Sequence, residues 1–209
     1  MSLKLRRKKE STVPPLEGGA YFGICVGIIN VGHQYSEKFK KSSEKVIFIF
    51  EIPSERVTID GESKPRWISE KYTCSLNSKA KLCEVLVAWR GRNFTDAELE
   101  EFDLTSMIGV PATLQVVQSE YNGNTYANIA GITGLPKGVL APRAENEFLI
   151  YDVSEPDEAV FEKLPEWIQN LIKASDEYAD SHVGEEILDI DTETGEVLTA
   201  PAGSGAVPF

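Results

Sequence analysis

Residues 78–89 read Ser-Lys-Ala-Lys-Leu-Cys-Glu-Val-Leu-Val-Ala-Trp, and this stretch decides the fold because the hydrophobic period changes within it. Its apolar side chains recur with the i, i+3, i+4, i+7 spacing of an amphipathic helix, at Leu82, Val85, Leu86 and Trp89. The apolar residues on both sides of it follow strand patterns instead. The sequence therefore predicts one helix set between two groups of strands.

Three strands are expected before this helix. Residues 20–31 are apolar and β-branched, with glycines that permit bending, and residues 45–52 are apolar on both faces, which is typical of a central strand. Residues 67–76 alternate between apolar and polar and predict a half-exposed strand. Between them we expect a polar loop at 33–44 and a mobile connection at 53–66, which is rich in charge and contains two prolines.

Two strands are expected after the helix, at 112–119 and 125–132, joined by a hairpin. The Asn122-Gly123 pair in that hairpin favours the positive φ angles of a type I′ turn. Thr95 and Glu98 form a capping-box pair that predicts a short second helix. The order is β-β-β-α-β-β, which is the connectivity of the OB-fold. The expected fold class is mainly β with accessory helices, a five-stranded OB-fold barrel with its helix between strands three and four.

Four segments are expected along the chain. Residues 1–19 form a flexible basic arm and residues 20–140 an OB-fold nucleic-acid-binding domain. Residues 141–174 form a C-terminal extension with a docked helix, whose first turn contains Pro165. Residues 175–209 lack a continuous core pattern and are expected to be a disordered acidic tail.

The charge is distributed unevenly between these segments. Residues 1–140 hold 18 Lys and Arg against 16 Asp and Glu, whereas residues 141–209 hold 3 against 17, so the parts carry +2 and −14 of the total −12. The low pI of about 4.7 therefore describes the C-terminal third, and the body remains able to bind a polyanion.

The composition also indicates the cellular compartment in which the protein is expected to work. The three cysteines form no CxxC pair and lie in apolar patterns, so we expect buried thiols in a reducing compartment, without disulfides or bound metal. The basic start is not followed by an apolar signal core, and no stretch approaches 18 consecutive apolar residues. The expectation is a protein of the cytoplasm, or of the host cytoplasm if phage-encoded, without a membrane segment.

The lysine-rich segment between the first two strands is the first candidate site. Lysines can follow phosphates while exposed rings stack on bases, and in an OB-fold this loop borders the nucleic-acid face. A solvated hairpin loop that happens to be basic is the alternative. The candidate residues here are Tyr35, Lys38, Phe39, Lys40, Lys41 and Lys45.

Other candidate binding residues come from three further segments. On the polar side of the third strand, Trp67 among cations is a stacking platform in one interpretation and covered by the C-terminal helix or the 53–66 connection in the other. Two arginines after the helix could contact phosphate or cap the helix C-terminus. These candidates are Arg66, Trp67, Lys71, Thr73, Arg90, Arg92 and Tyr121 at the last hairpin.

No nucleotide-binding, zinc-hydrolase or serine-hydrolase motif is present, and only two histidines occur. We therefore expect no catalytic residue, no metal and no cofactor. A metal-dependent nuclease using the carboxylates between Glu98 and Asp103 is the enzyme alternative, although a solvated surface helix explains the same residues.

The chain resembles a family of phage and prophage OB-fold proteins that bind single-stranded DNA. The resemblance covers about residues 20–140 and implies DNA binding with little sequence preference in replication, recombination or repair. It rests on Gly27-Ile28-Ile29-Asn30-Val31-Gly32, Lys71-Tyr72-Thr73-Cys74-Ser75-Leu76, Trp89-Arg90-Gly91-Arg92, Phe102-Asp103-Leu104 with Gly109, and Tyr126-Ala127-Asn128-Ile129 through Leu135-Pro136-Lys137-Gly138.

The last residues, Pro208 and Phe209, resemble the acidic C-terminus of bacterial single-stranded DNA-binding proteins, which recruits partner enzymes. Here an uncharged spacer, residues 200–207, separates them from the nearest acids. The expected partners are single-stranded DNA and, through this terminus, replication or recombination proteins, with a homo-oligomer left open. The alternative function is an OB-fold adaptor that binds proteins and not DNA.

Overall fold

The computed structural model describes residues 13–59 and 61–181. Its first three strands, β1 (Gly19–Ser36), β2 (Lys41–Ile59) and β3 (Glu62–Thr73), form two long antiparallel hairpins. A tight turn at 37–40 joins β1 to β2, with Lys40 at a φ of 50°. The expected loop at 33–44 and mobile connection at 53–66 are therefore wrong for most of their length. Ladder hydrogen bonds require no apolar face, so polar residues extend both hairpins beyond the hydrophobic runs.

Two α-helices and one 3₁₀ helix follow β3. The predicted helix is α1 (Lys81–Arg90), which ends at Gly91 with a φ of 69°. α2 (Asp96–Glu100) begins with the predicted capping box, in which the Thr95 hydroxyl accepts from the Glu98 backbone N–H and the Glu98 carboxylate accepts from the Thr95 backbone N–H. The 3₁₀ helix η1 (Leu104–Met107) then leads to the fourth strand.

The hairpin of β4 (Pro111–Tyr121) and β5 (Asn124–Thr133) has the turn that its sequence predicts. Asn122 and Gly123 both have positive φ, 49° and 78°, which confirms the type I′ turn. The sheet order is β3-β2-β1-β4-β5, with β4 antiparallel to the first half of β1. A sixth strand, β6 (Leu149–Asp152), runs parallel to the middle of β1 and was not predicted as a strand.

The sheet curls into a half-barrel around the first of two core clusters. This cluster joins inward side chains of β1–β5 to the buried face of α1, including Phe48, Phe50, Leu86 and Trp89. The ladders leave β3 and β5 at opposite ends of the sheet path. The mainly β architecture is therefore confirmed, whereas a closed five-stranded barrel stays a prediction.

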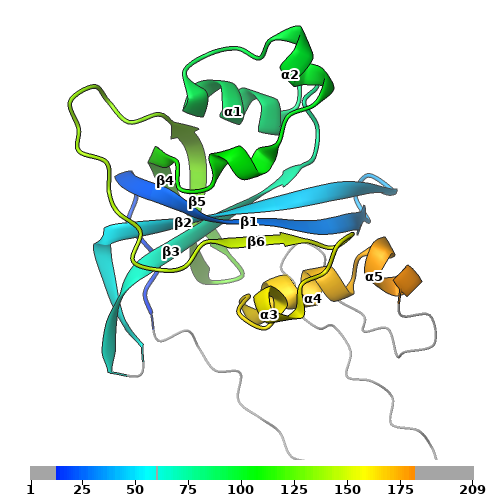
Figure 1. Ribbon diagram of the computed structural model, residues 1–209. Coiled ribbons are helices and arrows are strands. Elements are labelled where there is room, and N and C mark those ends of the chain that lie inside the picture. Colours follow the sequence, from blue (N-terminus) through cyan, green and yellow to red (C-terminus); the bar gives the residue numbers. More distant parts are fainter. Residues whose placement is uncertain (1–12, 60, 182–209) are drawn as a thin grey trace, which may run out of the picture.

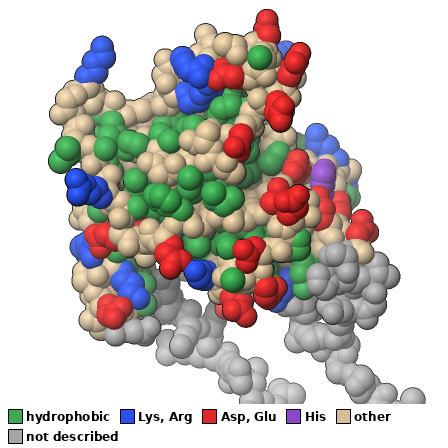
Figure 2. Space-filling view, in the orientation of Figure 1, with side chains coloured by type: hydrophobic (Ala, Val, Ile, Leu, Met, Phe, Trp, Pro, Cys, Tyr) green, Lys and Arg blue, Asp and Glu red, His purple; other side chains and the backbone are tan. Residues whose placement is uncertain are grey.

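The second core cluster covers the other face of β1 and β2. Figure 1 shows β6 and three helices on this side, with α1 and α2 on the opposite side of the sheet. These helices are α3 (Glu158–Phe161), α4 (Glu166–Lys173) and α5 (Asp176–Ser181). Ile168, Leu171 and Ile172 of α4 are fully buried in this cluster. Acidic side chains gather on the surface over these helices (Figure 2).

Two segment boundaries differ from expectation. The tail does not start at residue 175, because α5 continues the folded part to Ser181. The arm does not extend to residue 19, because Leu16 is buried in the first cluster and Gly19 begins β1. The rest of both segments, 1–12 and 182–209, lies outside the described residues. Within the described residues, no helix is both long enough and apolar enough to cross a bilayer.

Candidate nucleic-acid interface

A groove of about 530 Å³ lies where the β1–β2 hairpin meets β3. Lys45 pairs with Thr73 across the β2–β3 ladder, and alternate residues of the two strands point to the same face. This pairing brings side chains of the β1–β2 hairpin next to those at the end of β3, about 30 positions later in the chain. The groove is lined by Tyr35, Ser36, Phe39, Lys41, Ser43, Lys45, Lys71 and Thr73.

Lys45 is held at the floor of this groove. Its ammonium donates a hydrogen bond to the Thr73 hydroxyl at 2.7 Å. Burial lowers the pKa of Lys45 from its usual value, and the nearby charge of Lys41 acts in the same direction. A bound phosphate would oppose both effects, because an anion favours the charged form of the amine.

A second groove of about 620 Å³ continues from the first and shares Lys45, Lys71 and Thr73 with it. It extends along the end of β3 to the start of α1. We call the two together the lysine groove, with a hairpin section and a helix section. The helix section adds Glu70, Tyr72, Ser75, Asn77, Lys79, Ala80, Lys81 and Ile129.

The structure thus brings six of the thirteen candidate DNA-binding residues into one groove: Tyr35, Phe39, Lys41, Lys45, Lys71 and Thr73. Sequence reasoning missed the helix section. Lys79 and Lys81 lie at the start of α1, after the loop that follows β3, and two lysines flanking Ala80 at the start of a predicted helix were the available signal. No sequence pattern around Glu70 indicated that it would line the groove.

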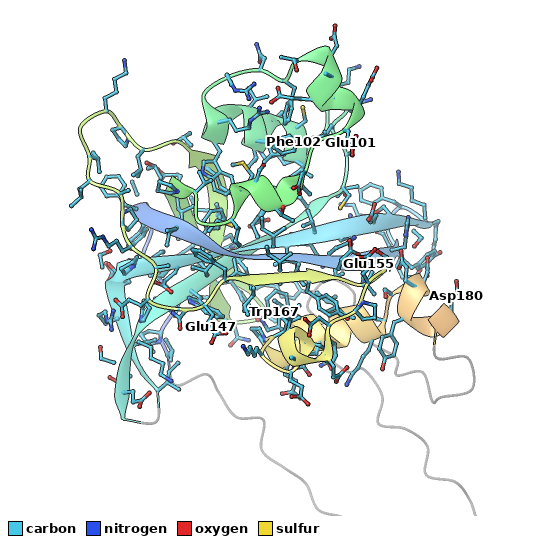
Figure 3. The ribbon with its side chains drawn as sticks, in the orientation of Figure 1. Glu101, Phe102, Glu147, Glu155, Trp167 and Asp180 are labelled. Atoms are coloured by element: carbon cyan, nitrogen blue, oxygen red, sulfur yellow. The ribbon has the colours of Figure 1, made fainter. Side chains whose placement is uncertain are left out.

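Arg90 and Arg92 are engaged with Glu98 instead of lining the groove. Arg90 is nearly buried, pairs with Glu98, and stacks between Phe94 and Phe102, 4.3 Å and 4.8 Å from the ring centroids. Figure 3 labels Phe102 in the segment after α2. Arg92 donates to both Glu98 oxygens, at 2.7 and 2.8 Å, and this bond lowers the pKa of Glu98 to about 2. The arginines therefore fix α2 onto α1.

The remaining candidates lie near the groove or away from it. Trp67 is half-buried and packs against the second core cluster. The Arg66 guanidinium donates to the Pro14 carbonyl and holds the start of the described chain. Lys38 and Lys40 lie in the β1–β2 turn, where Lys40 pairs with Glu37. Tyr121 is 67% exposed at the end of β4.

Phe39 is the most exposed aromatic side chain of the groove, at 67%. Replacing Phe39 with Ala is expected to weaken oligo-dT binding about fivefold to 150-fold, because stacking of one base on an aromatic ring is worth roughly 1–3 kcal/mol. The matched control is Phe148→Ala, since Phe148 is also exposed but lies outside the groove. Anisotropy titrations with oligo-dT measure the affinity of both variants. If Phe39→Ala and Phe148→Ala bind equally well, Phe39 does not contact the DNA.

Helix α5 is fastened to the β1–β2 hairpin beside the groove. The Glu177 carboxylate accepts from the His33 backbone N–H at 2.8 Å and contacts His33 Nδ1 at 2.6 Å. The Ser42 hydroxyl donates to Asp176 at 2.7 Å. The hydrogen bond to Glu177 raises the pKa of His33 above 6.5, and the charges of Glu177, Glu44 and Asp176 add to this effect.

This contact should make α5 docking depend on pH. The pKa of His33 is higher in the folded state than in the unfolded state, where it is about 6.5. The stability that the His33–Glu177 contact adds is therefore complete below about pH 6.5 and is lost as the pH rises through the folded-state pKa. An NMR titration in a His182→Ala background, which leaves His33 as the one histidine, should give a pKa above 6.5. Glu177→Gln should lower it, and an unchanged pKa in that variant would contradict the assignment.

Carboxylates that could have served a nuclease have other roles here. Glu98 is engaged with the two arginines, and Asp103 accepts from the Thr105 backbone N–H at 2.8 Å to begin η1. Among the described residues, no three His, Cys, Asp or Glu side chains come together as a metal site would require. Pro208 and Phe209, the residues predicted to bind a partner, lie outside the described residues.

A comparison with protein-family models finds no match to this sequence, and a comparison with curated proteins finds no significant match. The functional argument therefore depends on the residues and geometry of the lysine groove.

Proposed function

We propose that this protein binds single-stranded DNA in the lysine groove, without catalysing a reaction on it. The observation that carries the proposal is the groove lining, which combines five lysines with two exposed aromatic rings of the β1–β2 hairpin. Lysines can neutralise a run of phosphates while Tyr35 and Phe39 stack on bases, and neither contact depends on sequence. The five lysines are Lys41, Lys45, Lys71, Lys79 and Lys81.

The fold supports the same proposal. The order β3-β2-β1-β4-β5, with α1 following β3 in the chain, corresponds to an OB-like arrangement. In OB-folds the face of strands two and three and the loop between strands one and two bind oligonucleotides. The groove is lined by the β1–β2 turn and by residues of β2 and β3, and this location supports the proposal. α1 begins at its far end without a side-chain cap on Ala80, so the positive end of the helix dipole adds to the lysines.

The test is fluorescence anisotropy with labelled oligo-dT at two salt concentrations. Each phosphate contact releases counterions, so affinity should fall steeply with salt. Absence of micromolar binding at low salt would refute the proposal. Because the lysine and aromatic contacts do not read sequence, a mixed-sequence single strand should bind in the same affinity range.

We further propose that the C-terminus recruits replication or recombination proteins, through Pro208 and Phe209. A protein-binding adaptor without DNA binding is the second candidate function. The observation that favours it is the pair of exposed apolar side chains at β6, since Phe148, just before the strand, and Ile150 within it are 51% and 42% exposed. An adaptor would bind no oligonucleotide and would lose its partner on deletion of Phe209, whereas the DNA-binding protein would keep its oligonucleotide affinity in that deletion.

A further inference from the structure

The lysine groove contains one carboxylate, Glu70, in its helix section. Glu70 lies on the same face of β3 as the buried side chains of Ile68 and Tyr72, and this face is turned toward the first core cluster, which includes Ile129 of β5. There its carboxylate accepts a hydrogen bond from the Ile129 backbone N–H. Since β3 and β5 are the ends of the sheet path, this side chain occupies the gap between them.

The position is unfavourable for phosphate and suitable for a hydrogen-bond donor. Burial raises the pKa of Glu70, while the Ile129 N–H and the charges of Lys71 and Lys81 oppose this and favour the ionised form. An ionised carboxylate has two oxygens and about four lone-pair directions, and Ile129 uses one of them. The remaining acceptor capacity faces a groove that a nucleic-acid strand would fill.

We propose that Glu70 reads the base edge in the helix section and accepts from the exocyclic amino group of a base, cytosine above all. The inference rests on the proposed function. Carboxylates accept from cytosine N4 in direct readout of bases, whereas uracil presents carbonyl oxygens on both sides of its single N–H. Lys71 and Lys81 attract the phosphates that flank such a base, which leaves the base to face the carboxylate.

The groove therefore has two sections with different chemistry. The hairpin section offers lysines and rings, which accept any base. The helix section adds an oriented acceptor, because the Ile129 N–H fixes the carboxylate before the ligand arrives. A strand that spans both sections is held without sequence preference at one end and with a preference for an amino-bearing base at the other.

The test compares oligo-dC with oligo-dU at pH 8, because these pyrimidine strands differ in the groups that face Glu70. The native protein should bind oligo-dC about fivefold more tightly, which corresponds to about 1 kcal/mol of base discrimination. Glu70→Gln should bring the two affinities within about twofold of each other. The ratio is the readout, since removing a negative charge near phosphates strengthens binding to both strands.

Glu84→Gln is the matched control, because Glu84 carries the same charge on the exposed side of α1 and does not line the groove. This variant should keep the ratio. Oligo-dC methylated twice at each N4, which has no amino hydrogens, should bind the native protein like oligo-dU and requires no variant to fold.

Three results are decisive in different ways. A dC/dU ratio that is lost in Glu70→Gln and kept in Glu84→Gln supports the inference. Equal binding of the two strands by the native protein, or a ratio that survives Glu70→Gln, overturns the inference and leaves the proposed function standing. Absence of binding to every strand overturns the proposed function itself, and this inference with it.

Discussion

Replacing Lys41 and Lys71 together with Gln is expected to lower the affinity for oligo-dT about tenfold or more at low salt. Both side chains line the hairpin section, one from the start of β2 and the other from β3. If each contacts one phosphate, the slope of log affinity against log salt should fall by about 1.4, because each contact on a single strand contributes about 0.7. Anisotropy titrations at several salt concentrations measure both quantities.

The control is Lys137→Gln with Lys163→Gln, which removes the same charge from positions outside the groove. Lys163 pairs with Glu147 at 2.5 Å, on the side of the molecule that carries α3. Figure 3 labels Glu147 just before β6. Long-range charge effects alone would weaken binding equally in both double variants. Equal losses, with unchanged salt slopes, would therefore show that the groove lysines are not phosphate ligands.

How much of the fold the sequence predicts depends on whether an element has an apolar face. The sequence patterns of α1 and of the Asn122-Gly123 turn predict these elements, and the structure has both. The sequence of residues 53–66 does not predict a strand pair, because polar and charged side chains occur on both faces of this ribbon. β6 is four residues long and pairs with β1, more than 110 positions earlier in the sequence, so its apolar run gives no sign of a partner.

The residues of the candidate site likewise fall into those that a local sequence pattern predicts and those that it does not. Lysines and aromatic residues close together in the sequence, such as Phe39 and Lys41, are predictable because one hairpin holds them. Glu70 becomes part of the groove only when β3 approaches β5, which no local pattern specifies. Arg92 was predicted to be able to contact phosphate because the sequence does not show its pairing with Glu98, which lies six positions later across an irregular segment.

The polypeptide that crosses from β5 to β6 is fastened to the sheet by one buried carboxylate. Glu51 of β2 is fully buried and accepts from the backbone N–H groups of Glu145 and Asn146, at 2.7 and 3.1 Å. It also accepts from the Asn146 side-chain amide. Two backbone donors in this crossing thus depend on a single side chain, immediately before β6 begins.

Replacing Glu51 with Ala is expected to destabilise the protein by about 3–5 kcal/mol. A buried donor left without a partner costs about 1–3 kcal/mol, and the three part-buried N–H groups that lose their partner here lie toward the lower end of that range. For a protein of this size the melting temperature should fall by about 6–20 °C. Thermal unfolding measures the loss, and hydrogen exchange should show that the amides of Glu145 and Asn146 lose protection.

Two further variants separate this role from a general effect of charge. Glu51→Gln keeps the shape and one acceptor oxygen but places an NH₂ group against a backbone donor, so an intermediate loss of about 1–3 kcal/mol is expected. Glu55→Ala, which removes a half-exposed acid from the same strand, should stay within about 0.5 kcal/mol of the native protein. If Glu51→Ala were as mild as Glu55→Ala, another contact, such as the ion pair of Arg56 with Glu145, would hold the crossing in place of Glu51.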